Sequence, residues 1–117
     1  MKSFDLNVKI AAEENAYSMI ELSGFLDAHT VNSFEGRLED LLEEGRCKMV
    51  IDLQDLNYIS SAGIGALMAM TQKLRNNGGD LILFRPNEKV YKILDLLGFT
   101  KIFNVATDEQ DLKKQLD

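Results

Sequence analysis

Two adjacent hydroxyl groups stand in the stretch "YISSAGIGALMAM" (58–70), immediately before an apolar run with helical spacing. We expect Ser60 and Ser61 at the amino end of that helix, where the first backbone N–H groups have no partner within the helix. One serine suffices to cap a helix by accepting a hydrogen bond from those N–H groups. The other is a candidate for phosphorylation, because a phosphoryl group there meets the positive end of the helix dipole. Capping alone remains the simpler alternative.

The residues after the serines are unusually small. Ala62, Gly63, Gly65 and Ala66 leave the backbone open to close approach by another molecule. Glycine is costly inside a helix, so its presence indicates that something needs the space. Because a strand is expected just before, the stretch falls at the carboxyl-end crevice where open α/β sheets tend to bind ligands. The pattern therefore favours a docking site.

Catalytic chemistry finds little support in the composition. A serine nucleophile needs a base within hydrogen-bond reach, and the one histidine, His29, lies at the start of another expected helix. The chain has neither a "GxSxG" elbow nor a "GxxxxGK[ST]" loop, and "GIG" lacks the third glycine of a dinucleotide fingerprint. One histidine and one cysteine, Cys47, offer no ligand spacing for a metal. We predict no catalytic residues, no metal and no cofactor.

Charge and hydropathy restrict the partners and the compartment. The net charge of -6, from 13 basic and 19 acidic side chains, argues against nucleic acid and against an anionic membrane surface. No apolar run approaches the roughly 20 residues of a membrane span, and the first residues lack the apolar segment of a signal peptide. A single cysteine suits a reducing compartment. We expect a cytoplasmic protein without direct membrane insertion.

The elements that position the serines follow from the hydrophobic period. We expect a hairpin of two strands whose turn is "AEEN" (12–15), and three further strands, the central one ending near Leu53. The strand sequences are "FDLNVKI" (4–10), "AYSMIEL" (16–22), "KMVIDL" (48–53), "LILF" (81–84) and one near "KIFNV" (101–105).

Helices are expected between these strands. One begins near Asp27 as a cap and ends at Gly45, one runs from Ser61 to "NNGG" (76–79), one runs from Pro86 and Asn87 to Gly98, and a polar one begins near Asp108. In the second helix we assign Met68 to the buried stripe and leave Met70 open. Alternating strands and helices predict an α/β fold with a mixed sheet of about four to five strands and helices packed against it.

Several of these stretches together resemble the STAS domain, the fold shared by bacterial anti-sigma factor antagonists and the cytoplasmic tails of sulfate transporters. They are "GFLD" (24–27), "IDL" (51–53), "YISSAGIGALM", "GGDLILF" and "VYKILDLLGFTKIF". The resemblance covers essentially the whole chain and implies a single domain over 1–117.

In the antagonists the motif reads approximately Asp-Ser-Ser/Thr-Gly-Leu-Gly, and the first serine is the phosphoacceptor. Ser60 occupies the aspartate position, Ser61 the phosphoacceptor position, Ala62 the position of the second hydroxyl, and residues 63–65 the rest. The resemblance implies Ser61 as phosphosite, with Ser60 as fallback. Two departures, the missing aspartate and the missing hydroxyl, leave room for different regulation.

The resemblance also implies a mechanism without catalysis by this chain. The unphosphorylated antagonist binds an anti-sigma factor that is a serine kinase of the histidine-kinase-like ATPase type, and so releases a sigma factor. Phosphorylation separates the two, and a metal-dependent serine phosphatase resets the antagonist. The expected partner-binding residues, with the two aspartates near the same end of the sheet, are Asp27, Asp52, Ser60, Ala62, Gly63, Ile64 and Gly65.

Two alternatives use the same fold. One is a docking subunit of a transport or signalling complex that is never phosphorylated, whose small residues permit close helix packing. The other is a nucleotide-sensing domain.

Overall fold

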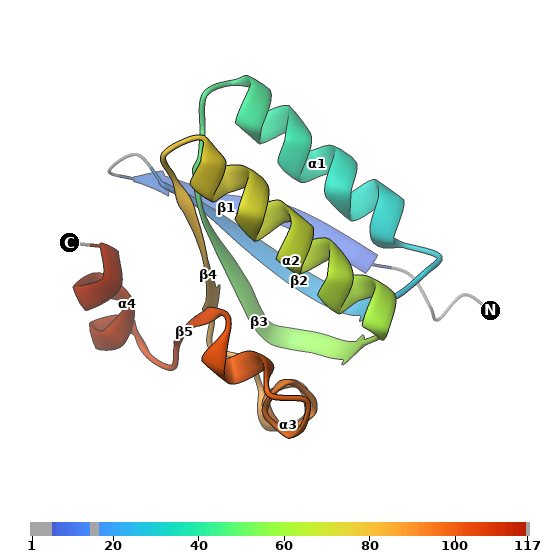
Figure 1. Cartoon of the computed structure of the whole chain (residues 1–117). Coiled ribbons are helices and arrows are strands. Elements are labelled where there is room, and N and C mark those ends of the chain that lie inside the picture. The colour runs from blue at the N-terminus through green and yellow to red at the C-terminus, as the bar shows by residue number, and fades with distance from the viewer. Residues whose placement is uncertain (1–5, 15–16, 117) are drawn as a thin grey trace.

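The structure is a computed structural model that describes residues 6–14 and 17–116, with the side chains of that range other than 10–14. Five strands and four α-helices alternate along it, as Figure 1 shows. The elements are β1 (Leu6–Glu14), β2 (Tyr17–Leu26), α1 (Val31–Glu43), β3 (Lys48–Ile59), α2 (Ser61–Asn76), β4 (Asp80–Phe84), α3 (Glu88–Leu96), a short 3-10 helix η1 (Phe99–Lys101), β5 (Asn104–Ala106) and α4 (Glu109–Leu116).

The strands form one sheet in the order β1-β2-β3-β4-β5. The β1–β2 pair is antiparallel and the other three pairs are parallel. Parallel neighbours need crossover connections, and α1, α2 and α3 supply them. The predicted α/β class and mixed sheet are therefore confirmed.

The hairpin differs in detail from the prediction. Residues 12–14 of the expected turn continue β1 and pair with β2 after a register shift between Ile10 and Ala12. Asn15 of the expected turn lies outside the described residues, as does Phe4 of the expected strand.

The central strand β3 is longer than predicted. It does not end near Leu53 but runs on to Ile59, while its pairing with β2 shifts register twice, between Glu21 and Ser23 and between Gly24 and Phe25. Each shift inserts an extra residue in β3, as a β-bulge does. The buried residues consequently fall three apart, at Leu53, Leu56 and Ile59, instead of alternating.

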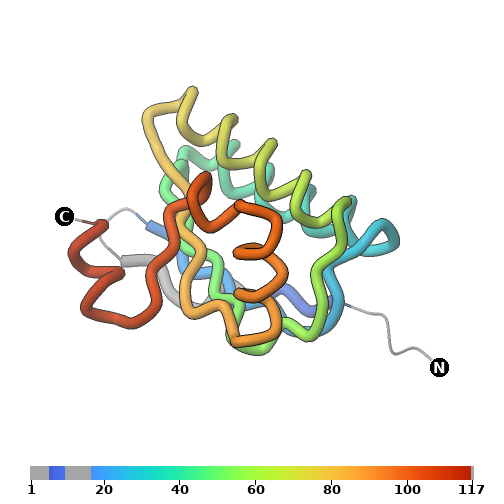
Figure 2. Tube along the Cα trace, turned by 60° about the horizontal axis from the view of Figure 1, so that its bottom comes forward, coloured from blue at the N-terminus to red at the C-terminus, as the bar shows by residue number. Residues whose placement is uncertain are grey.

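The two faces of the sheet are covered unequally. Helices α1 and α2 lie side by side across one face (Figures 1 and 2), and Leu38, Leu67 and Ile51 belong to the large apolar core beneath them. The other face carries a small cluster that includes Val50 and Leu112 of α4. Because successive side chains of a strand point to opposite faces, Asp52 lies on the α4 face with Val50.

The carboxyl ends of α1 and α3 and the amino end of α3 agree with the expected caps, whereas α1 begins at Val31 with Thr30, not Asp27, as its N-cap. Gly45, with φ 88°, ends α1, and Gly98, with φ 82°, follows α3, both in the left-handed conformation that glycine adopts without strain. Asn87 caps α3 by accepting a hydrogen bond from Val90 N at 2.9 Å. Its amide nitrogen also lies 2.7–3.2 Å from the carbonyl oxygens of Leu53, Gln54 and Leu56.

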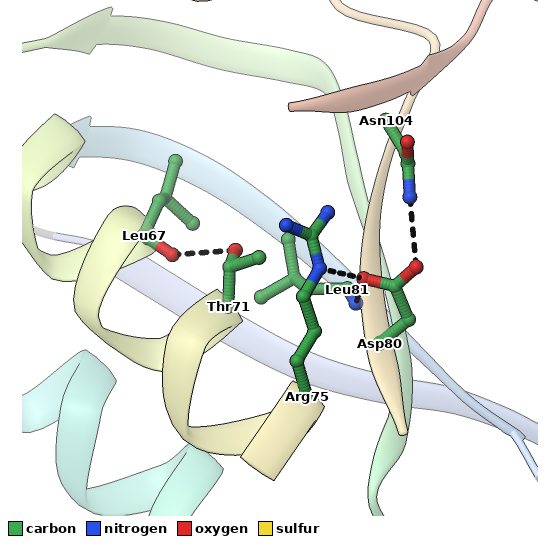
Figure 3. A network of polar contacts seen from close by, with 6 residues as sticks. All are labelled: Leu67, Thr71, Arg75, Asp80, Leu81 and Asn104. Carbon is green, nitrogen blue, oxygen red and sulfur yellow. Dashed lines mark hydrogen bonds and ion pairs between the residues drawn. The ribbon is translucent and has the colours of Figure 1, made fainter. Parts of the chain in front are cut away.

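Polar contacts attach the carboxyl end of α2 to the sheet (Figure 3). Arg75 Nε donates to Asp80 Oδ1 at 2.9 Å, and Asp80 Oδ2 accepts from Asn104 Nδ2 at 2.7 Å. Within the helix, the buried Thr71 donates to Leu67 O at 2.7 Å. The two bonds of Asp80 join α2, β4 and β5 at the end of the helix opposite Ser61.

The assignment of Met68 to the core is wrong. Its side chain is 39% exposed, whereas that of Met70 is 3% exposed and belongs to the core. Met70 follows Ala66 by four residues and Leu67 by three, so it falls in the centre of the stripe that faces the sheet.

Candidate functional site

The ends of β2 and β3 bring the two predicted motifs together. Leu26 pairs with Ile59, and Ser60 N donates to Leu26 O at 2.9 Å. Asp27 therefore follows β2 at the same end of the sheet where Ser60 and Ser61 follow β3. The expected position of Asp27 at the same end of the sheet as the serines agrees with the structure.

The two serines have different environments. Ser60 is the N-cap of α2, with extended backbone, and its Oγ accepts from Gly63 N at 3.3 Å. Ser61 is the first helical residue and is exposed. Within the described residues its hydroxyl makes no hydrogen bond. Capping therefore occupies one hydroxyl and leaves the other accessible.

The small residues divide into two groups. A Cβ on Gly63 would lie 2.8 Å from Leu26 O and 2.9 Å from Leu26 Cγ, so this glycine lets α2 approach β2 closely. Ile64 is also buried. In contrast, Gly65 is exposed with no atom near the equivalent position, and Ala62 is half-buried. Gly63 and Ile64 are thus buried against the sheet, whereas Ala62 and Gly65 are accessible at the amino end of α2.

Asp27 organises the turn before α1. Its Oδ1 accepts from His29 N at 2.9 Å and from Thr30 N at 3.2 Å, and Thr30 is the N-cap residue of α1. The helix begins at Val31, so Asp27 stabilises the preceding turn rather than capping the helix directly. The carboxylate is partly exposed beside the serines.

The expected position of Asp52 near the serines is wrong. It lies eight residues before Ser60 in the sequence, roughly 20–25 Å along an extended strand, and on the other face of the sheet. Its buried carboxylate accepts from Arg85 Nη2 at 2.7 Å and from Gln54 N at 3.0 Å. This hydrogen bond to Asp52 raises the pKa of Arg85. Asp52 is therefore part of an ion pair beside α4.

The electrostatics of α2 favour an anion at Ser61. The first turn of the helix carries no acidic residue, while Lys73 and Arg75 lie in its last turn. No carboxylate within that first turn therefore offsets the positive end of the dipole. A phosphoryl group at Ser61 would occupy this position without competing for the cap held by Ser60.

Two residues were not singled out from the sequence, Tyr58 near the serines and Arg85 on the opposite face of the sheet. Tyr58 is 43% exposed at the end of β3, and its ring lies 6.1 Å from that of Phe25 on β2. Arg85, the partner of Asp52, has φ 51°, which is unusual for a residue other than glycine. The sequence carries no signal for this backbone conformation.

The described residues contain neither a metal-binding cluster nor a membrane-spanning helix. Within residues 6–14 and 17–116, no three histidine, cysteine or acidic side chains are grouped so that they could hold a metal ion. The helices of the same described part are all too short or too polar to span a bilayer.

Comparison with known proteins identifies relatives along nearly the full length. The chain is 25% identical over 114 residues to the anti-sigma F factor antagonist of Paenibacillus polymyxa, covering 96% of this chain and 97% of that protein. It is 21% identical to the anti-sigma-B factor antagonist of Listeria monocytogenes serovar 1/2a, covering 92% and 95% respectively. These relatives carry the name that the sequence motifs predicted.

Solved structures share the fold. An anti-sigma factor antagonist from Mycobacterium paratuberculosis superposes with a TM-score of 0.81 at 20% identity, covering 96% of this chain and 95% of that one. The unphosphorylated form of the antagonist SpoIIAA gives 0.73 at 21% identity, covering 95% and 96%. The model of the STAS domain matches residues 7–112. Since that match spans most of the chain and includes the whole serine motif, the protein belongs to the STAS domain family.

Proposed function

We propose that this protein is an anti-sigma factor antagonist, a single domain over residues 1–117 that is controlled by phosphorylation of Ser61. The observation that carries the proposal is the exposed hydroxyl of Ser61 at the first position of α2, next to a different serine that already caps the helix. The names of its full-length relatives support the same function.

The partner is an anti-sigma factor that is also a serine kinase. It docks on what we call the Ser61 surface, made of Asp27, Ser60, Ser61, Ala62 and Gly65, all of which are at least partly exposed. Gly65 presents bare backbone there, which allows a partner to approach α2 closely. The protein itself acts as a regulator in the cytoplasm and not as an enzyme.

Phosphorylation of Ser61 weakens this contact for two reasons. The phosphate brings about 1.5 to 2 negative charges onto a surface that already contains Asp27, and it adds bulk beside Gly65. It leaves the fold intact, because the amino end of α2 favours an anion. A metal-dependent serine phosphatase restores the binding form.

Two substitutions test the switch directly. With the anti-sigma factor kinase and ATP, Ser61→Ala abolishes phosphorylation and retains binding, whereas Ser61→Asp weakens binding by at least about tenfold, a change of about 1.4 kcal/mol. Ser60→Ala is the matched control, since it removes the cap, at about 1 kcal/mol of stability, but leaves Ser61 available. Mass spectrometry of the tryptic peptide from Met49 to Lys73 locates the phosphate.

The outcomes separate the alternatives. Phosphate on Ser60 alone moves the switch to the fallback residue. If Ser61→Asp binds as tightly as the parent and the peptide is never phosphorylated, the switch is wrong, and the protein is a constitutive docking subunit of a transport or signalling complex.

A further inference from the structure

A cavity of about 280 Å³ lies on the sheet face opposite α1 and α2, between the strands and α4. Its apolar wall consists of Met19, Phe84, Leu112 and Leu116. It is separated by the sheet from the Ser61 surface, so the proposed switch does not use it. Cavities that bind small molecules are typically about 300–1,000 Å³ and mostly apolar with a few convergent polar groups, and this cavity is close to the lower limit.

Charged groups of both signs line the same cavity. Glu21 of β2 and Glu109 of α4 contribute carboxylates, and Lys113, one turn after Glu109, contributes an ammonium group. None of these three side chains forms an ion pair within the described part of the chain. Asp52 and Arg85 complete the charged lining, but they already bond to each other.

Backbone and side-chain contacts hold Arg85 at the cavity. Its backbone has φ 51°, its N–H donates to Ala106 O at 2.8 Å, and its guanidinium lies 4.9 Å from the centre of the Phe84 ring. Nη2 is engaged by Asp52, while Nη1 has no acceptor among the described residues. The side chain is 40% exposed, while its Nε is buried without a hydrogen-bond partner among the described residues. Residues in such uncommon backbone conformations concentrate at functional sites.

We propose that this cavity binds a small zwitterion, an α-amino acid with an apolar side chain. A simple anion would meet three carboxylates, and a simple cation would meet Arg85 and Lys113. A zwitterion places its ammonium near Glu21 and Glu109 and its carboxylate near Lys113 and Arg85 Nη1. The apolar side chain then covers the wall formed by Met19 and its neighbours.

The size of the cavity agrees with this class of ligand. Its volume of about 280 Å³ is close to the lower end of the range for cavities that bind small molecules, about 300 Å³. A ligand as small as a single amino acid, such as leucine or phenylalanine, matches that size.

Calorimetric titration and thermal unfolding of the full chain test the proposal. Leucine, isoleucine and phenylalanine are compared with isoamylamine, which is leucine without its carboxylate, and with 4-methylpentanoate, which is leucine without its ammonium group. We expect at least one amino acid to bind and to raise Tm by several degrees at saturation, and both analogues to bind at least about tenfold more weakly, about 1.4 kcal/mol. The proposal is overturned if no amino acid binds at about 10 mM, ten times a Kd of about 1 mM, or if one analogue binds as well as the amino acid.

Substitutions locate the binding on the molecule. Glu21→Gln and Lys113→Gln each remove one charge at the cavity without changing the shape of the backbone, and each weakens binding at least about tenfold. Lys114→Gln is the matched control, because Lys114 is the next residue of α4 and does not line the cavity. Equal affinities of the two lysine variants would exclude this cavity as the site. Partner binding through Ser61 is measured separately, so failure of either proposal leaves the other testable.

Discussion

Replacing Asn87 by aspartate tests how the serine-bearing end of β3 is supported. β4 ends at Phe84, opposite Asp52, so the carbonyl groups of β3 beyond that point have no neighbouring strand on this side. The amide nitrogen of Asn87 takes their place, at 3.2 Å from Leu53 O, 2.9 Å from Gln54 O and 2.7 Å from Leu56 O. Asn87→Asp retains the oxygen that caps α3 and replaces the donor by an anionic oxygen.

The magnitude follows from these contacts. An amide nitrogen has two hydrogens for the three acceptors, and each net hydrogen bond contributes about 1 kcal/mol, so about 2 kcal/mol is lost. Leu53 and Leu56 are buried, so their carbonyl groups are left unsatisfied beside a negative charge, which costs about 1 to 2 kcal/mol more. We expect a total of about 3 to 4 kcal/mol at neutral pH. With a urea m-value of about 2 kcal/mol/M, the midpoint falls by about 1.5 to 2 M.

The pH dependence distinguishes this explanation from a general loss of packing. The carbonyl oxygens disfavour the charged form of the introduced carboxyl, so its pKa in the folded state rises above the unfolded value of about 3.9. The penalty relative to the parent is therefore complete above the folded pKa and decreases as the pH falls toward 3.9, where the protonated carboxyl donates one hydrogen bond. Asn87→Ala has no such group, and its penalty stays constant. Urea unfolding of all three proteins at neutral and acidic pH measures this; a loss below about 1 kcal/mol, or equal pH profiles for both variants, would refute the reasoning.

Two further changes probe the packing of α2 and the ion pair of β3. Gly63→Ala places a methyl group against Leu26 and lowers stability by about 1 to 3 kcal/mol, whereas Gly65→Ala meets open space and stabilises the helix by about 0.5 to 1 kcal/mol; thermal unfolding compares them. Arg85→Ala leaves the buried carboxylate of Asp52 without its cation and costs about 3 kcal/mol, discounted to about 2 because Arg85 is partly exposed, while the double change with Asp52→Asn recovers part of that loss in urea unfolding.

The sequence was sufficient for the order of elements and for placing Ser60 and Ser61 at the amino end of α2. Helix caps and left-handed glycines such as Gly45 depend on local chemistry, so they can be recognised without knowledge of the fold. The same holds for Ser60 as a cap. The exposure of Ser61 could not be predicted, because it depends on how α2 is rotated over the sheet.

The errors concern residues whose environment is set by distant parts of the chain. The two bulges of β3 place Leu53, Leu56 and Ile59 three apart, a spacing that is not that of a regular strand, and the prediction consequently ended the strand too early. Asp52 was then expected at a strand end. Met68 was misassigned because both methionines fit an apolar stripe in sequence, and only the packing of α2 against β3 and β4 decides between them.

The contact of Gly63 with Leu26 determines how any signal at the neighbouring serine is transmitted. The first turn of α2 packs closely against β2 at Gly63, so we expect the backbone to have little room to move inward when Ser61 changes its charge. Crystal forms with and without a phosphate there should superpose, and amide exchange in the sheet should be the same in both. Under the proposed switch, a partner then distinguishes the two states by the charge and bulk of the phosphate on an unchanged backbone, and the modifying enzymes, not a rearrangement of this domain, determine the speed of the response.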